Sequence, residues 1–447
     1  MAGLENVVVL NSKSSVAVLG GGYAGMAAAA ELAAAGIKVS VFEAGKVLGG
    51  RARRVELAEQ SFDNGQHLVI GAYTELLAMM AKVGVDCEAA FLRMPMELVV
   101  EPDFRLACPK LPAPLHLAVG LIFAQGLTWA ERFALLRAIR VAQAADWQLA
   151  EDVSVSCWLA DQRQPKVLIS RFWQPLTVAA LNTPLELASA QVLLNVLRDS
   201  LGGARAASDL LLPKLDFSAL FPDAAERFIQ QRGGQVYRSR RITQLEKTPE
   251  GWRLNGEPEC FDAVICALPP HGLSPVLATL PQLKVLGDWI YQPIVTVYLQ
   301  YDQSTRLARP MQGLSDSLAQ WVFDRSFTHG MDGLIAVVIS ATGSHQFLPQ
   351  EELAAAVVAE LHQRLALPVE VLWQQVITEK RATFACTPSM QRPSNKTTEH
   401  GFWLAGDYTR GLAGSGDYPA TLEGAVRSGV AAAQGVVQEL MTNTIEE

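Results

Sequence analysis

The chain has 447 residues, of which 50% are hydrophobic and 18% charged, and its net charge is −8. This length predicts two or three domains with sizeable cores, and the acidic balance without a basic run argues against nucleic acid as a partner. The six cysteines form no CxxC pair and the seven histidines show no ligand spacing, so we expect reduced thiols and no metal site.

The first predicted elements form a dinucleotide-binding pattern. An apolar strand is expected over residues 16–19 and runs into Gly20, Gly22 and Gly25, where a helix rich in Ala and Leu begins and continues to residue 35. Gly20 suits the tight turn, Gly22 lets the backbone approach a pyrophosphate, and Gly25 lets the helix pack on the strand. The N-terminus of this helix would present free N–H groups to the phosphates.

A second apolar strand follows over residues 38–42 and ends at Glu43. An acid about 20 residues after the first glycine accepts hydrogen bonds from the adenosine ribose, and a glutamate there argues against a 2′-phosphate. Gly49, Gly50 and Arg51 come next. They predict a second loop over the pyrophosphate with Arg51 as a bidentate clamp; an ordinary polar loop with a solvated arginine is the alternative.

The region from residue 76 to 215 is expected to be largely helical. Capping boxes that begin at Thr128 and Thr183 predict two helices, the first reaching about residue 150. The most apolar stretch, residues 115–127, is shorter than the roughly 20 residues that span a bilayer. It reads either as a buried helix or as an interfacial one.

Residues 216–270 return to α/β character, and a second sheet is expected after them. The predicted strands cover residues 235–246, 262–269, 293–301, 320–323, 334–340 and 369–378, with a helix over residues 350–365.

A second motif near the C-terminus completes the first. The apolar strand 402–405 leads to Gly406 and Asp407, which places a carboxylate to bond the ribityl hydroxyls of a flavin. Residues 419–423 open a helix whose first N–H groups would face the flavin N1/O2 edge, where charge gathers on reduction. A structural aspartate and a capped helix are the alternative. The first motif alone indicates a dinucleotide, and the two together indicate tightly bound, non-covalent FAD.

These elements predict an α/β fold with a discontinuous Rossmann-type FAD-binding domain formed by residues 15–75, 216–285 and 395–440. A helical cap, residues 76–215, and a substrate domain with a mixed β-sheet, residues 286–394, interrupt it.

The paired motifs resemble the amine oxidase/phytoene desaturase type of FAD flavoprotein. Within that group the chain resembles the hydroxysqualene dehydroxylases, or squalene-associated FAD-dependent desaturases, of bacterial hopanoid pathways. The resemblance runs from about residue 15 to 435, although the loop 410–417 is longer than expected. It is carried by residues 62–67, 172–176, 180–184, 207–213, 405–409 and 419–429. It implies that Ala24, Ala44, Ile242, Thr421 and Leu422 also contact FAD.

The resemblance implies reductive removal of the hydroxyl group of hydroxysqualene, which gives squalene and water. An acid would protonate the leaving oxygen, and the allylic cation would take a hydride from reduced FAD in a dry, apolar tunnel. The aromatic-rich cap suits a long isoprenoid, although ordinary core packing also explains its rings. Residues 62–67 are implied to lie beside the flavin. His67 and Asp63 are therefore the candidate acids, unless His67 is a satisfied structural histidine and Asp63 only orients the backbone.

Two other functions stay open. The first is oxidation, by a carotenoid-type polyprenoid desaturase or by an amine oxidase. Amine oxidases of this fold generally keep a lysine near the flavin, and no lysine occurs here between Lys284 and Lys380. The second is a non-catalytic prenyl-binding carrier that resembles the GDP-dissociation inhibitors. The intact glycine and acid set argues for retained FAD and against a carrier.

Localisation follows from the substrate. The first 14 residues lack a basic region ahead of a short apolar run, so no signal peptide is expected. Because substrate and product are long hydrocarbons, we expect a cytoplasmic protein that is peripheral to the inner membrane, with upstream prenyl synthases as further partners. Residues 115–127 with Trp129 are expected at the tunnel mouth in one leaflet, and Arg132, Arg137 and Arg140 at the lipid surface.

Overall fold

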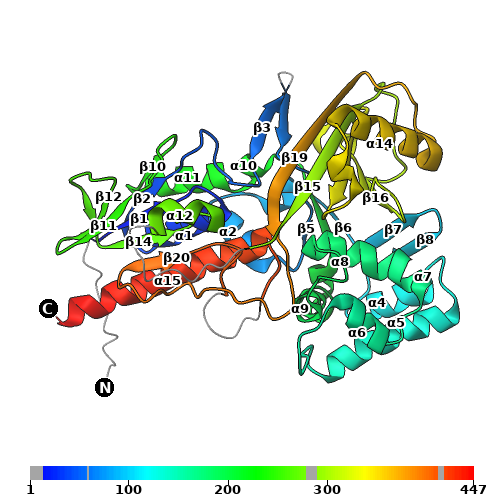
Figure 1. The fold of residues 1–447 in the computed structure, drawn as a ribbon, viewed down its shortest axis with the longest axis horizontal. Coiled ribbons are helices and arrows are strands. Elements are labelled where there is room, and N and C mark those ends of the chain that lie inside the picture. Colours follow the sequence, from blue (N-terminus) through cyan, green and yellow to red (C-terminus); the bar gives the residue numbers. More distant parts are fainter. Residues whose placement is uncertain (1–13, 58–59, 278–288, 411–416, 447) are drawn as a thin grey trace.

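The computed structural model describes residues 14–57, 60–277, 289–410 and 417–446. The apolar run at residues 7–10, Lys284 and most of the loop 410–417 therefore lie outside the described residues. Three parts lie side by side: a nucleotide-binding domain that holds both ends of the chain, a cap of helices, and a mixed sheet (Figure 1).

The nucleotide-binding domain is built on a five-stranded parallel sheet in the order β10-β2-β1-β14-β20. These strands are β1 (Ser15–Leu19), β2 (Lys38–Phe42), β10 (Gln235–Tyr237), β14 (Ala263–Cys266) and β20 (Phe402–Leu404). Parallel strands need crossovers, and here the crossovers include whole domains. The predicted discontinuous sheet is therefore observed, although the strand expected over residues 235–246 ends at Tyr237.

Glycines bring the elements of this domain unusually close. A Cβ on Gly25 would lie 2.0 Å from the carbonyl oxygen of Gly20, and one on Gly429 would lie 2.1 Å from that of Ala24. Helix α1 (Tyr23–Ala34) can therefore press against the β1 turn on one side and against α15 (Leu422–Glu446) on the other. Gly36, at φ +80°, lies just after the end of α1.

Smaller elements complete the domain. They are the hairpin β3 (Arg54–Leu57) and β4 (Gln60–Asp63), the sheet β5 (Val69–Ile70), β9 (Leu210–Pro213) and β6 (Phe91–Met94), the sheet β11 (Leu245–Thr248), β12 (Gly251–Leu254) and β13 (Cys260–Phe261), and the helices α2 (Thr74–Lys82), α3 (Cys87–Ala90), α10 (Phe217–Leu220), α11 (Pro222–Gln231) and α12 (Pro270–Leu277).

The mixed sheet has seven strands in the order β19-β15-β18-β17-β16-β7-β8. They are β15 (Tyr291–Gln300), β16 (Met311–Leu314), β17 (Trp321–Asp324), β18 (Leu334–Ser340), β19 (Trp373–Phe384), β7 (Glu97–Glu101) and β8 (Phe104–Ala107), with α13 (Ser326–His329) and α14 (Gln350–Leu365). The helix predicted over residues 350–365 is confirmed, whereas the last strand begins at Trp373 rather than at residue 369.

The expectation that residues 76–215 are largely helical needs correction, because this region also contributes strands β6, β7, β8 and β9. Strand β7 pairs in parallel with β16, with Val100 opposite Gly313, and β6 and β9 pair with each other. The cap proper consists of α4 (Leu115–Ile122), α5 (Trp129–Ala144), α6 (Val155–Asp161), α7 (Lys166–Leu168), a π-helical turn (Ile169–Trp173), α8 (Gln174–Leu181) and α9 (Ala190–Leu201).

One of the two predicted capping boxes is present. Thr128 and Glu131 cap α5 reciprocally. The box at Thr183 is wrong, because Thr183 instead donates to the Leu181 carbonyl and accepts from the N–H group of Cys386. Residues 184–188 form a turn, and α9 begins at Ala190 with Ser189 as its N-cap.

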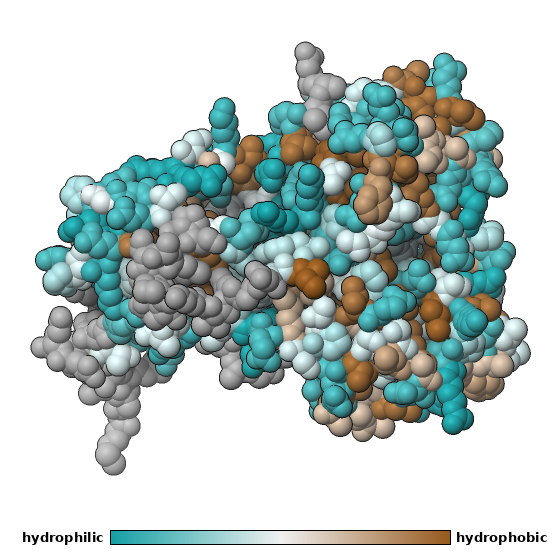
Figure 2. Space-filling view, in the orientation of Figure 1, coloured by the Kyte–Doolittle hydropathy of each residue, from teal (hydrophilic) through white to brown (hydrophobic). Residues whose placement is uncertain are grey.

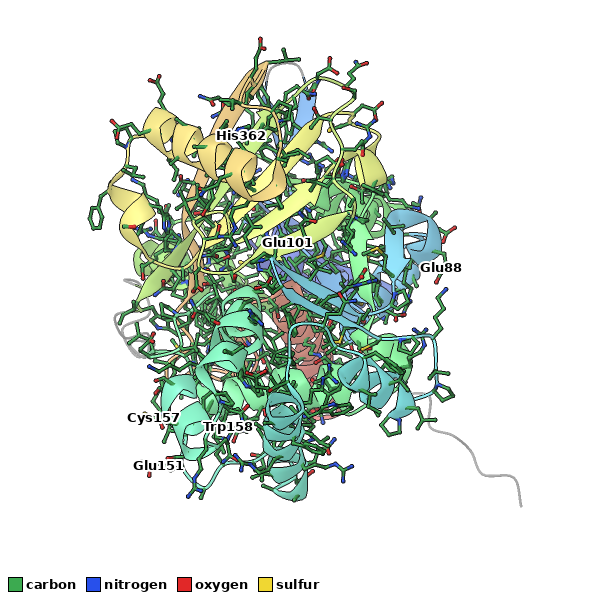
Figure 3. The ribbon with its side chains drawn as sticks, turned by 90° about the vertical axis from the view of Figure 1, so that its right-hand side faces the viewer. Glu88, Glu101, Glu151, Cys157, Trp158 and His362 are labelled. Atoms are coloured by element: carbon green, nitrogen blue, oxygen red, sulfur yellow. The ribbon has the colours of Figure 1, made fainter. Side chains whose placement is uncertain are left out.

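The surface follows this division. On the face shown in Figure 2, apolar residues gather over the cap and the mixed sheet, whereas the nucleotide-binding domain is mainly hydrophilic. Seen from the cap side, α14 with His362 covers one end of the molecule, and α6 with Cys157 and Trp158 lies at the opposite end (Figure 3).

Candidate functional site

A cavity of about 1090 Å³ is lined by residues of all three parts. We call the part lined by the nucleotide-binding domain the cofactor half, and the part lined by the cap and the mixed sheet the apolar half. The volume slightly exceeds the range of roughly 300–1,000 Å³ that ligand pockets usually occupy. The cavity can therefore hold a dinucleotide and part of a substrate together.

The cofactor half begins at the N-terminus of α1. Gly20, Gly22 and Ala24 line the cavity, and Gly22 is the N-cap without a side-chain hydrogen bond. No acidic residue occupies the first turn of α1. Uncapped N–H groups and the positive end of the helix dipole are thus available to a phosphate.

Glu43 lies beside this helix and is held by backbone. Its Oε2 accepts from the N–H group of Gly21 at 2.7 Å, and its Oε1 accepts from that of Gly45 at 2.6 Å. Each carboxylate oxygen keeps a second lone pair for a ribose hydroxyl. Ala44 and Ile242, for which the resemblance implies contact with FAD, line the same cavity.

Arg51 and Asp407, from opposite ends of the sequence, form one ion pair. The Arg51 Nη2 lies 2.6 Å from Asp407 Oδ2, and the Arg51 Nη1 donates to the Ala382 carbonyl at 2.8 Å. Both side chains line the cavity with Gly50 and Gly406. The predicted phosphate clamp and the predicted ribityl ligand therefore hold each other in place.

The start of α15 forms another wall. Thr421 accepts from the N–H group of Gly424 at 3.1 Å, so its hydroxyl caps the helix. The N–H groups of Leu422 and Glu423 are free of this cap, and Thr421 and Leu422 line the cavity. Tyr408 also lines this cavity, and its buried hydroxyl finds no hydrogen-bond partner among the described residues. Uncapped amides, an orphaned hydroxyl and a fixed carboxylate together fit a flavin dinucleotide.

The apolar half collects residues that are far apart in the sequence. Three of the segments that carry the resemblance, residues 172–176, 180–184 and 207–213, contribute side chains to it. Together with Leu210 of β9, its apolar lining includes Met96, Leu98, Phe172, Leu176, Ala179, Ala180, Val196, Leu197, Leu201, Ile294, Met311, Trp321, Phe323 and Val338. Such a wall accepts a hydrocarbon and excludes water.

His67 lies on the cavity wall near the loop of Gly65. Its Nδ1 is 2.8 Å from the Gly65 carbonyl, so Nδ1 must carry the proton of the neutral ring, and Nε2 can exchange a proton with a ligand. Burial lowers the pKa of His67, the hydrogen bond to Gly65 opposes this shift, and the Arg51 cation adds to it. The neutral ring is thus favoured near pH 7, and donation from Nε2 requires the imidazolium.

Asp63 does not line the cavity. Its side chain is fully buried, and Oδ1 accepts from the N–H group of Phe217 at 2.8 Å. Oδ2 lies 3.6 Å from Nη2 of Arg325. Burial raises the pKa of Asp63 to about 6, against the lowering effect of Arg325. The structure therefore separates the two candidate acids, and only His67 faces the cavity.

Several cavity residues were missed by the sequence reasoning. Tyr418 and Asp199 line the cavity and share a hydrogen bond of 2.8 Å, and Glu379 accepts from Asn64 at 3.1 Å. Tyr418 opens the C-terminal motif but was given no role, whereas Asp199 and Glu379 belong to no motif. The pair Asp324 and Arg325, at the end of an apolar strand, was the one local signal of a buried charge.

The comparisons with known proteins agree with this geometry. The family described as flavin containing amine oxidoreductase matches residues 23–437. The chain is 27% identical to a hydroxysqualene dehydroxylase of Sinorhizobium fredii, over 96% of this chain and 99% of that one. It is 29% identical to one of Rhodopseudomonas palustris, over 95% and 98%. A zeta-carotene desaturase of Zea mays is 26% identical, over 93% and 82%.

Among solved structures, an oxidoreductase from Methanosarcina mazei superposes with a TM-score of 0.71 at 15% identity, over 95% of this chain and 100% of that one. At this identity the likeness concerns the fold.

Proposed function

The chain belongs to the flavin containing amine oxidoreductases, and on this premise we propose that it removes the hydroxyl group of hydroxysqualene reductively, giving squalene and water. It is an oxidoreductase with FAD as its cofactor. Bound FAD, when reduced, supplies the hydride. The similarity to two hydroxysqualene dehydroxylases over nearly the whole chain supports the proposal, and such a product would serve bacterial squalene and hopanoid biosynthesis.

The observation that carries the proposal is the single cavity with a cofactor half and an apolar half. Residues of the family resemblance, such as Phe172, Leu176 and Leu210, line the apolar half. The half that holds the dinucleotide is continuous with it, so a hydrocarbon there can reach a bound flavin. An allylic cation survives only where water and nucleophiles are kept away.

Polar side chains at the edge of the apolar half are already engaged. Asn182 donates to the Pro293 carbonyl and to Thr383, and it accepts from the N–H group of Ala341. Both the nitrogen and the oxygen of its side-chain amide are therefore held by protein partners. His67 supplies the proton: its ring is fixed through Nδ1, and protonation at Nε2 gives an acid for the leaving hydroxyl.

Amine oxidation is less well supported. Lys46, in the cofactor half, is the one lysine among the described residues that line the cavity. Within the part of the chain that the structure describes, the apolar half therefore has no lysine of the kind that amine oxidases of this fold generally use. A carotenoid-type desaturase is the second candidate, because the chain is similar to a zeta-carotene desaturase and an apolar cavity also suits that substrate.

Membrane contact is part of the proposal. Among the described residues, no helix combines the length and the apolar character needed to cross a bilayer. Exposed apolar side chains gather instead on α4 and α5: Phe123 is 76% exposed, Phe133 65% and Trp129 59%. On α5, Leu135, Ala138 and Ala142 face the core. The opposite face thus offers an apolar stripe that can enter the lipid interface.

The expected basic residues flank this stripe. Arg137 and Arg140 are exposed, whereas Arg132 is half-buried and donates to the Ala124 carbonyl at 2.6 Å. The guanidinium of Arg132 lies 4.6 Å from the ring of Trp129. No described residue of 115–129 lines the cavity, so the expectation that this segment forms the tunnel mouth is wrong. We propose that it anchors the protein to the membrane surface beside the cavity.

Product analysis tests the proposal against the desaturase. Reduced holoenzyme is incubated without oxygen with hydroxysqualene, and oxidised holoenzyme with phytoene and, separately, with a primary amine. Squalene from the first mixture alone supports the proposal. A polyene with an added double bond from the second mixture, and no squalene from the first, would replace it with the desaturase.

A further inference from the structure

Arg325 is the most deeply buried arginine or lysine among the described residues, and the proposed chemistry gives it no role. It follows β17, its side chain is 2% exposed, and its partner Asp63 is 0% exposed. The Nε atom of Arg325 and Oδ2 of Asp63 have no hydrogen-bond partner among the described residues. Burying such a pair costs desolvation that its attraction often does not repay, so stability alone is a poor reason for it.

One arm of this pair reaches His67 through Gln66. The Nη1 of Arg325 donates to Oε1 of Gln66, and Nε2 of Gln66 donates to the His67 carbonyl at 3.2 Å. The N–H group of Gln66 also donates to Thr296 of β15 at 3.3 Å. The mixed sheet therefore holds the backbone of residues 66 and 67 through side chains that are buried.

The other arm reaches the His67 ring through Phe217. Asp63 Oδ1 accepts from the N–H group of Phe217, and the carbonyl of Phe217 accepts from the Tyr23 hydroxyl at 2.7 Å. The ring of Phe217 lies 4.8 Å from that of His67, centroid to centroid. Asp63 thus fixes the position of Phe217, whose ring packs against the imidazole of His67.

Between these arms the backbone turns at Gly65, with φ +114°. Residues with a side chain rarely adopt this backbone conformation. The carbonyl of Gly65 is also the group that fixes Nδ1 of His67. The loop has no regular structure of its own, so its shape depends on the contacts made by Asp63, Gln66 and Thr296.

We propose that Arg325 and Asp63 are positioning residues: their buried ion pair holds both the backbone and the ring of His67 in the orientation that presents Nε2 to the cavity. The ion pair joins the nucleotide-binding domain, through β4, to the mixed sheet, through β17. It therefore ties the orientation of the His67 ring to the relative position of two of the three parts that line the cavity. The link to proton transfer rests on the proposed function, whereas the positioning itself does not.

The test measures the ring of His67 directly in FAD-loaded protein. Histidines are labelled with ¹³C at Cε1, and the His67 signal is assigned by its loss in His67→Gln. The titration of the His67 signal is followed in the wild type, in Arg325→Met and in Gln66→Leu. Gln66→Leu keeps the Arg325–Asp63 ion pair but removes the hydrogen bond from the Gln66 side chain to the His67 carbonyl. Arg306→Met is the matched control, because Arg306 pairs with Asp332 at the exposed edge of the same sheet.

In Arg325→Met and Gln66→Leu we expect the His67 signal to broaden or split, and its midpoint to rise toward the ordinary value of about 6.5. In turnover, kcat should fall roughly 10- to 100-fold with a much smaller change in KM, because a small displacement of a reacting group is costly. Arg306→Met should match the wild type in both measurements.

A His67 signal and pH–rate profile identical to the wild type, in either variant with FAD bound, would overturn the positioning role. If Arg325→Met does not fold, Gln66→Leu decides. A shifted His67 titration together with full turnover in His67→Gln would uphold the positioning and reject His67 as the acid. The two proposals therefore fail separately.

Discussion

Arg51 and Asp407 meet at 2.6 Å across 356 residues of sequence. Arg51 follows the first nucleotide-binding motif, and Asp407 follows β20 at the other end of the chain. Each was expected to contact FAD by itself. Their ion pair fixes the two motifs relative to each other before any ligand is bound, which lowers the ordering cost of binding.

A double-mutant cycle measures this coupling. Arg51→Met and Asp407→Asn should each weaken FAD binding by about 1–3 kcal/mol, as expected for loss of a hydrogen-bond partner. The double variant should lose less than the sum, with a coupling of roughly 0.5–3 kcal/mol. Flavin fluorescence gives the FAD dissociation constants of the wild type, the two single variants and the double variant. Strict additivity would show that the two side chains act on FAD independently.

Glu43 offers a second test of the cofactor half. Glu43→Ala removes the expected ribose partner and frees the N–H groups of Gly21 and Gly45. FAD binding should weaken by about 1–3 kcal/mol. Glu88→Ala, on α3 at the surface of the molecule (Figure 3), is the control and should bind FAD like the wild type. Equal affinity of the two variants would remove Glu43 from the site.

Local patterns predicted the parts of this fold that local physics determines. The strand, glycine turn and helix around Gly20 to Gly25 follow from backbone sterics and helix propensity, and α14 follows from its periodicity. The pairing of β7 with β16 could not be predicted in this way, because it joins residues about 200 positions apart. The false capping box at Thr183 shows the same limit: a tertiary contact with Cys386 uses the hydroxyl that the pattern assigned to a helix.

The residues of the site also differ in whether they could be predicted from local patterns or only from contacts between distant segments. Motif residues such as Glu43 and Leu422 could be placed at the cavity from the sequence, because they stand at fixed offsets from a strand and a helix. Arg325 and Asp199 belong to no motif, because their contacts with Asp63 and Tyr418 join segments that are far apart in the sequence. Asp63 and His67 were found together but could not be told apart, because only the fold shows that one is buried behind the cavity wall.

The acid role of His67 predicts a pH dependence with a definite sign. Because burial lowers the pKa of His67, the imidazolium is scarce near pH 7, and its fraction grows as the pH falls. The rate of C–O cleavage should therefore rise as pH falls through 6.5 toward the lowered pKa. His67→Gln should slow cleavage by roughly 10²–10⁴-fold and flatten this profile. A profile that stays steep in His67→Gln would assign the proton to another group.

The membrane stripe predicts a loss of binding without a loss of fold. The double variant Phe123→Glu and Phe133→Glu replaces two exposed rings, one directly after α4 and one on α5, with charged side chains. The FAD content of the protein should stay unchanged, whereas its co-sedimentation with phospholipid vesicles should be lost. Leu121 is a poorer position, since it packs partly against the core. Phe347→Glu with Val369→Glu is the control, because these side chains are 87% and 61% exposed elsewhere. Equal sedimentation of both double variants would reject the stripe.

The direction of electron flow is the central claim, and a single turnover tests it most directly. FAD in the purified protein is reduced without oxygen, excess reductant is removed, and hydroxysqualene is added while flavin absorbance and squalene are measured together. We predict one squalene formed for each FAD that becomes oxidised. FAD that stays reduced beside unchanged hydroxysqualene, or squalene formed without flavin oxidation, would contradict reductive dehydroxylation.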